Sequence, residues 1–234
     1  MQIKDSVVLV TGANRGIGAE FVRQLKERGA AKIYATARDA ASITADGVEA
    51  VALDVTDEGQ VRAIAERATD VTILINNAGV SLGADLIGGD MDTIRRELET
   101  NAFGPLNTTR AFAPVLAANG GGAILNVLSA IAWFAAPGAT SYGMSKAAAF
   151  SLTEGTRALL ARQGTQVAGL LMALIDTDMA AGMDAPKTAP ETLVATALDG
   201  LEAGAIEILG DAMTVQLKAH MHLDPAERYA MFAG

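Results

Sequence analysis

Short apolar runs rich in Val, Ile, Leu and Ala recur along the chain, with room for a helix between one run and the next. Runs of this length, bounded by polar or glycine-rich residues, predict β-strands, and a near-continuous apolar run is typical of a strand covered on both faces. We interpret seven runs as strands: residues 7–10, 32–37, 48–53, 71–75, 123–128, 166–172 and 205–209.

The segments between these runs carry helical signals. Ile17, Phe21 and Leu25 recur at helical spacing, and Gly29 follows as a helix stop. Further helices are expected to begin at the caps Asp57 and Asp90 (the latter reaching Asn101), to cover residues 105–118 and 141–163, and to begin at Pro190.

Because strands and helices alternate, the pattern predicts an α/β fold with one doubly wound parallel sheet of about seven strands and helices on both faces. We find no internal repeat, low-complexity tract or linker. Residues 1–234 are therefore expected to form a single domain, with a loop near residues 176–190 and a short, partly helical tail from Asp211.

Composition narrows the classes of partner. The 234 residues are half hydrophobic but only 4% aromatic, so the core must consist mainly of aliphatic side chains and Met. The net charge of −9 argues against nucleic acid or an anionic membrane as a partner, because both require basic surface.

Cysteine is absent, which excludes disulfides and thiolate metal sites. His220 and His222 stand two apart and would diverge on a helix, so we expect no metal site. The first residues do not resemble a signal peptide, and the longest uncharged apolar run, 167–175, is too short to cross a bilayer. We therefore expect a cytoplasmic protein.

The glycines after the first strand suggest a nucleotide site. Gly12, Gly16 and Gly18 lie between that strand and a helix, an order typical of the first unit of a dinucleotide-binding, Rossmann-like fold. The alternative is an ordinary strand-to-helix loop. Arg38 ends the second strand where an NAD-binding chain usually has an acidic residue, and Arg15 offers a second guanidinium. This favours NADP(H) and leaves NAD(H) possible, since Arg38 could also be a solvated surface charge beside Asp39.

Tyr142 and Lys146 are the main candidates for chemistry. Residues four apart on a helix lie on one face, so the phenol and the ammonium would share one space. A neighbouring cation lowers the pKa of a phenol from its ordinary value of about 10, which suits a general acid or base. Ser129 ends the strand before them and could donate to a substrate oxygen. Taken alone, a Tyr and a Lys at this spacing also occur by chance on many helices.

Taken in order, the motifs Thr11-Gly12-x-x-x-Gly16-x-Gly18, Asn76-Asn77-Ala78-Gly79, Asn101, Ser129 and Tyr142-x-x-x-Lys146 resemble those of the short-chain dehydrogenase/reductase family. The resemblance covers the chain up to about Gly210. It implies that hydride passes from the nicotinamide C4 to a carbonyl carbon while Tyr142 donates the proton and Ser129 holds the carbonyl oxygen. Lys146 would bind the nicotinamide ribose and lower the tyrosine pKa, and Asn101 would keep a water in a proton relay.

The resemblance also implies a cofactor-binding set: Gly12, Asn14, Arg15, Gly16, Ile17, Gly18, Arg38, Asp54, Val55, Asn77, Ala78, Gly79, Tyr142, Lys146, Ile175 and Thr177. One departure concerns the end of the sixth strand, where Met172-Ala173 replaces the Pro-Gly usual in the family. This changes the expected backbone path and pocket shape. An apolar substrate pocket is predicted from Ile131, Trp133, Phe134, Met172, Leu174, Met179 and Met183, of which about half could prove to be core.

These observations favour an NADPH-dependent reductase of a hydrophobic ketone or aldehyde, acting reversibly on the alcohol. Two alternatives stay open: a non-catalytic NADP-binding redox sensor and an NAD-linked alcohol dehydrogenase. By analogy with the family, a homodimer or homotetramer is expected through the helices at 105–118 and 141–163.

Overall fold

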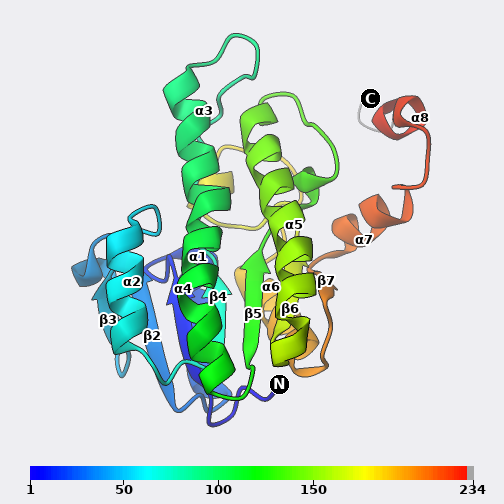
Figure 1. Ribbon diagram of the computed structural model, residues 1–234. Coiled ribbons are helices and arrows are strands. Elements are labelled where there is room, and N and C mark those ends of the chain that lie inside the picture. Colours follow the sequence, from blue (N-terminus) through cyan, green and yellow to red (C-terminus); the bar gives the residue numbers. More distant parts are fainter. Residues whose placement is uncertain (231–234) are drawn as a thin grey trace.

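Within residues 1–230, the part of the chain that the computed structural model describes, seven parallel strands form one sheet in the order β3-β2-β1-β4-β5-β6-β7 (Figure 1). The strands are β1 (Val7–Thr11), β2 (Lys32–Ala37), β3 (Glu49–Ala52), β4 (Ile73–Asn76), β5 (Ala123–Val127), β6 (Gln166–Leu171) and β7 (Glu207–Leu209). The predicted doubly wound α/β fold is therefore confirmed. The last four residues of the predicted tail lie outside the described residues.

The helices fall where the sequence pattern predicts them. They are α1 (Gly16–Glu27), α2 (Glu58–Arg67), α3 (Met91–Leu98), α4 (Gly104–Ala118), α5 (Thr140–Leu160), α6 (Pro190–Glu202), α7 (Ala212–Ala219) and α8 (Pro225–Ala230). Asp57 and Asp90 cap α2 and α3 as predicted, each accepting backbone N–H groups of the first turn. The helix expected to run to Asn101 ends at Leu98, and a π-helical turn, η2 (Glu99–Phe103), follows it.

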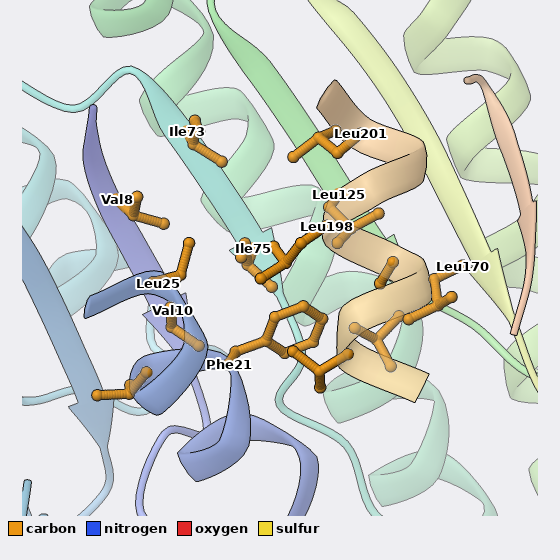
Figure 2. Close-up of a cluster of buried hydrophobic side chains, with 14 of the residues drawn as sticks. Val8, Val10, Phe21, Leu25, Ile73, Ile75, Leu125, Leu170, Leu198 and Leu201 are labelled. Carbon is orange, nitrogen blue, oxygen red and sulfur yellow. The ribbon is translucent and has the colours of Figure 1, made fainter. Parts of the chain in front are cut away.

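Alternating side chains of the strands supply two cores. Val8 and Val10 of β1 face one core and Leu9 faces the other, because successive side chains of a strand point to opposite faces. Helices α1 and α6 cover the first face, where Phe21 and Leu198 pack against the sheet (Figure 2). Helices α2 and α4 cover the second face, and α5 packs beside α4 (Figure 1).

The order of the strands determines where a ligand can bind. From β1 the chain builds outward through β2 to β3, and then returns to add β4 on the other side of β1. The carboxyl ends of β1 and β4 thus flank a topological switch point, the usual ligand site of an open parallel sheet. Residues 12–18 follow β1 and residues 77–79 follow β4, so both predicted cofactor segments meet there.

No helix among residues 1–230 is long and apolar enough to cross a membrane. Cytoplasmic location stays a prediction.

Candidate active site

The glycine-rich turn is built for close backbone approach. Gly12 and Gly16 have φ values of +64° and +53°, a region that favours glycine. A Cβ on Gly18 would lie 2.0 Å from the carbonyl oxygen of Gly12, so no side chain fits where α1 passes the turn. The first turn of α1 therefore opens with bare backbone N–H groups, an arrangement suited to a pyrophosphate.

Asn77 holds this turn from the β4 side. Its Nδ2 donates to the carbonyl oxygens of Thr11 and Gly12, at 2.9 and 3.0 Å. The hydroxyl of Thr11 accepts the backbone N–H groups of Asn77 and Ala78 in return. The Asn77 side chain thus supports the glycine turn, and only the backbone of residues 77–79 is left to pass along a ribose.

A cavity of about 360 Å³ lies beyond the carboxyl ends of β2 and β3. It is lined by the predicted residues Arg38 and Asp54 together with Thr56, Val80, Leu82, Arg96, Glu99 and Thr100. The Asp54 carboxylate also accepts the N–H and hydroxyl of Thr56, which fixes its orientation. The cavity brings a guanidinium and a carboxylate together beyond the strand ends, a combination that fits the adenosine part of a dinucleotide.

Arg15 is engaged elsewhere. Its guanidinium pairs with Asp178 of the 176–190 loop at 3.1 Å, both side chains being well exposed. An exposed pair of this kind contributes only about 0–1 kcal/mol. The contact links the glycine turn to the predicted substrate loop, and Arg15 is absent from the lining of the Arg38 cavity.

Three other predicted cofactor residues face the protein interior. Val55 is buried against Gly104, and Ile175 belongs to the core under α6. Ile17 is half-buried and packs against the same core, while Asn14 is half-buried in the turn. Thr177 differs, because its methyl group lies 3.4 Å from the position of a Cβ on Gly16, so it borders the glycine turn.

Ser129, Tyr142 and Lys146 gather at the carboxyl end of β5. Lys146 is 5% exposed, its Nζ lies 5.8 Å from the centre of the Tyr142 ring, and it donates to the carbonyl oxygen of Val127 at 2.9 Å. A Cβ on Gly79 would lie 3.7 Å from that Nζ, so the β4 segment adjoins the lysine. The Ser129 hydroxyl donates to the carbonyl oxygen of Met172 at 3.3 Å.

Burial controls the ionisation of this pair in the protein alone. It raises the pKa of Tyr142 to about 12; hydrogen bonding with Ser129 opposes the rise and the negative charge of Glu97 adds to it. Burial also lowers the pKa of Lys146 to about 8. In the protein without cofactor the net shift of the tyrosine pKa is therefore upward, because desolvation is the largest cause, and the role expected of Lys146 in lowering it stays a prediction. At neutral pH the phenol carries its proton.

Asn101 lies in the π-helical turn. Its Nδ2 donates to the carbonyl oxygen of Val80 at 2.8 Å and to Ser145 Oγ at 2.9 Å, while its Oδ1 accepts the Val80 N–H. Both amide protons are thus used by the protein. π-helical turns often occur at functional sites, and the water relay expected at Asn101 stays a prediction.

The predicted substrate pocket divides into two groups. Met172 is buried in the core under α6, so it forms core and not a pocket wall. Ile131, Trp133 and Phe134 are half-buried after Ser129, and Met179 and Met183 are about half exposed on the 176–190 loop. The tail reaches this region, since the N–H of Ala135 donates to the Tyr229 hydroxyl at 2.9 Å.

A smaller cavity of about 180 Å³ includes Leu174, the remaining predicted pocket residue. It is lined further by Ala173, Pro186, Lys187, Thr188, Asp211, Ala212 and Met213. Asp211 accepts the Ala173 N–H at 2.7 Å, which fixes the backbone where Met172-Ala173 replaces Pro-Gly.

Sequence reasoning missed Arg96, Glu99, Lys187 and the buried Glu97. Arg96, Glu97 and Glu99 lie within one turn or so before Asn101, and a search of the helix leading to a predicted site residue would have found them. Lys187 lies in an irregular loop, where periodicity carries no signal.

The family model for short chain dehydrogenases matches residues 6–188. The crystal structure of a short chain dehydrogenase from Burkholderia cenocepacia J2315 in complex with NADP superimposes with a TM-score of 0.95, at 42% sequence identity, covering 99% of this chain and 98% of that one.

Two curated relatives are similar over most of the chain. Short-chain dehydrogenase/reductase 3 of Homo sapiens is 32% identical over 215 residues, which cover 83% of this chain and 71% of the human protein. Galactitol 2-dehydrogenase of Agrobacterium fabrum is 33% identical over 186 residues, which cover 75% of this chain and 73% of the relative.

Proposed function

The chain belongs to the short-chain dehydrogenase family of oxidoreductases, and from this premise we propose that it reduces a hydrophobic ketone or aldehyde with NADPH, reversibly. The observation that carries the proposal is the gathering of Ser129, Tyr142 and Lys146 at the carboxyl end of β5, beside the β4 segment that borders the glycine turn. Bound NADPH would supply the hydride.

In this proposal the side chains divide the remaining work. The Ser129 hydroxyl donates to the substrate carbonyl oxygen and orients it. Tyr142 gives its proton to the same oxygen as negative charge develops there, which requires a phenol that is protonated at working pH. Its pKa of about 12 supports that state. The Lys146 ammonium binds the nicotinamide ribose and favours the phenolate left after transfer.

The preference for NADPH rests on Arg38. Its guanidinium lines the cavity of about 360 Å³ beyond the ends of β2 and β3, where it can pair with a 2′-phosphate, and Arg96 lines the same cavity. The Burkholderia relative was crystallised with NADP. Asp54 and Thr56 also line this cavity and would face the adenosine.

The apolar character of the substrate rests on Ile131, Trp133 and Phe134 after Ser129 and on Met179 and Met183 across the loop. A second candidate is oxidation of a polyol, favoured by the similarity to galactitol 2-dehydrogenase. This is the NAD-linked dehydrogenase alternative in a more specific form. Formation of NADH from NAD⁺ and galactitol at a higher kcat/KM than NADPH-dependent ketone reduction would select it.

The test measures oxidation of NADPH and NADH with a panel of aryl and aliphatic ketones, for the wild type and Tyr142→Phe. We expect turnover with NADPH to exceed that with NADH at least tenfold, and the mutation to lower kcat at least about 10²-fold, the usual contribution of a general acid. Unchanged binding of NADPH to the variant is the control. Full turnover by Tyr142→Phe would refute the mechanism, and binding without turnover on any substrate would favour the redox sensor.

We also propose that the protein works as a homodimer or homotetramer through α4 and α5. Support comes from Leu159 of α5, whose 81% exposure leaves a large apolar side chain in water. We propose further that residues 1–234 act as one domain, with the loop at 176–190 covering the substrate.

A further inference from the structure

The loop that joins β4 to α3 is anchored at alternate residues. The N–H of Val80 donates to Asn101 Oδ1 at 2.8 Å, and the N–H of Leu82 donates to the Glu97 carboxylate. The carbonyl oxygen of Ala84 accepts from Ser141, and the N–H of Leu86 donates to the hydroxyl of Thr140. The middle of this loop, residues 80–86, is therefore held between α3 with η2 on one side and the first turn of α5 on the other.

Two of these anchors also bind α5 directly, with equal spacing. Asn101 Nδ2 donates to Ser145 Oγ at 2.9 Å, and four residues earlier on each helix the Ser141 hydroxyl shares its one proton between Glu97 and the carbonyl oxygen of Ala84. Residues four apart lie on one helix face. Glu97 and Asn101 thus make two matching links, each to one backbone N–H of the loop and one serine of α5.

The two serines directly precede the pair that carries the proposed chemistry. Ser145 stands before Lys146, and Ser141 stands before Tyr142. The link through Asn101 therefore fixes the helical turn that presents the lysine, and the link through Glu97 fixes the turn that presents the tyrosine.

Glu97 is an unusual residue for a purely structural link. Its side chain is 0% exposed, and none of the ion pairs formed within residues 1–230 includes it. An unpaired buried charge is costly, and a neutral side chain could accept the same two hydrogen bonds. The negative charge of Glu97 also acts on Tyr142, where it raises the pKa of the phenol in the same direction as burial does.

We propose that Glu97 is a positioning residue: through Leu82 and Ser141 it fixes the loop after β4 and the first turn of α5, and its carboxylate lies against the turn that carries Tyr142. The charge keeps the phenol protonated for carbonyl reduction, and the links hold it in place. The catalytic role given to Glu97 rests on the proposed function, whereas its hydrogen bonds and its charge do not depend on that function.

Other charged groups near Tyr142 are few. Within residues 1–230, Lys146 is the one other buried charged side chain on α5 or on an element that packs against α5. The remaining charged side chains of α3, η2 and α4 are exposed: Asp92, Arg95, Arg96, Glu99 and Arg110. Glu154 and Arg157 of α5 lie three or more turns from Tyr142, and β6 and the short helix after Ser129 carry no charged residue.

Two variants separate the charge from the links. Glu97→Gln removes the charge, while its amide can still accept the Leu82 N–H and donate to the Ser141 hydroxyl. Ser141→Ala keeps the charge and breaks the link to α5. Asp92→Asn is the matched control, because it removes one negative charge from an 83% exposed side chain on the same helix.

The first measurement follows the ultraviolet absorbance of tyrosinate as the pH is raised, without substrate. Each variant is also made in the Tyr142→Phe background, and the difference in absorbance between the two proteins isolates the ionisation of Tyr142. In Glu97→Gln the ionisation of Tyr142 is expected to move to lower pH by roughly 0.5–1 pH unit, whereas Asp92→Asn leaves it in place. Ionisation at the wild-type pH in Glu97→Gln would overturn the role of the charge.

The second measurement tests the links with Ser141→Ala. We expect faster amide hydrogen exchange in residues 80–89 and a kcat lowered at least about fivefold, with NADPH affinity unchanged. Wild-type exchange and wild-type kcat in this variant would overturn the positioning role. Because the titration and the exchange need no turnover, failure of the proposed reaction would show only in the kcat measurements and would leave the titration and exchange results to be judged separately.

Discussion

Lys146 shows that the sequence can predict where a site residue lies but not how the site ionises. The four-residue spacing from Tyr142 predicted that the two side chains share one space, and they do. The direction of the tyrosine pKa shift depends on how much water the fold excludes and on Glu97, which comes from another helix. Neither quantity is visible in a motif. Met172 illustrates the same limit, because an apolar residue at a strand end serves core and pocket equally well in a sequence.

The buried lysine should cost the protein stability at neutral pH. Its pKa is about 8 in the folded state, against 10.5 as the ordinary value, so the unfolded chain binds more protons between these two pH values. Wild-type stability should therefore rise with pH from about 8 to 10.5, and burial of the charge should cost about 3 kcal/mol below pH 8.

Lys146→Met removes that cost together with the hydrogen bond to Val127, which contributes about 1 kcal/mol. The variant should be more stable than the wild type at pH 7 by about 2 kcal/mol, or roughly 4–8 °C in Tm, and inactive. The gain should vanish by about pH 10.5. Thermal unfolding without cofactor at several pH values measures it, with the exposed Lys4→Met as control. A loss of stability at pH 7 would contradict the argument.

At the scale of elements, the periodicity of apolar residues predicted the position of every strand and of the main helices to within a few residues. The exception is the helix predicted to reach Asn101, which changes to a π-helical turn after Leu98. A π turn changes hydrogen bonding without changing which residues are apolar, so periodicity gives no sign of it. The anchored loop after β4 was likewise outside prediction, because its bonds go to residues distant in sequence.

Replacement of Gly by Ala is expected to have opposite effects at two helical positions. A Cβ on Gly18 would lie 2.0 Å from the Gly12 oxygen and 2.6 Å from Asn77 Nδ2, whereas a Cβ on Gly155 of α5 would meet nothing within 4 Å. Gly18→Ala should weaken NADPH binding at least tenfold and lower Tm, since backbone must move. Gly155→Ala should raise stability by about 0.5–1 kcal/mol through helix propensity. Calorimetry and NADPH titration of both variants test this, and equal effects would contradict it.

At the scale of the whole molecule, the doubly wound parallel sheet followed from the alternation of strands and helices, whereas the order of its strands is known from the structure. The surface did not, because the exposure of a residue such as Leu159 depends on how α5 packs on the sheet and on α4. The composition of the two cavities also depended on segments that meet only in the folded chain.

Leu159→Glu tests the proposed assembly. If α5 forms the contact between subunits, a carboxylate in place of this side chain should be desolvated without a partner, and the dimer or tetramer should dissociate toward monomers. Light scattering coupled to size exclusion measures the mass, with Leu86→Glu, on the exposed loop after β4, as control. A monomeric wild type, or a variant with the mass of an oligomeric wild type, would rule out this interface.

The single tryptophan of the chain, Trp133, stands four residues after Ser129, half-buried, with the Lys218 ammonium 5.1 Å from its ring centre. Its near-ultraviolet emission therefore reports on one place, the apolar segment beside the reacting groups, without interference from any other indole. The emission of tryptophan overlaps the absorption of reduced nicotinamide, so arrival of the cofactor can be followed by energy transfer in the unlabelled protein. A bulky substrate that displaces water from the indole would shift the emission maximum, which makes the wild-type chain a ready instrument for screening ligands.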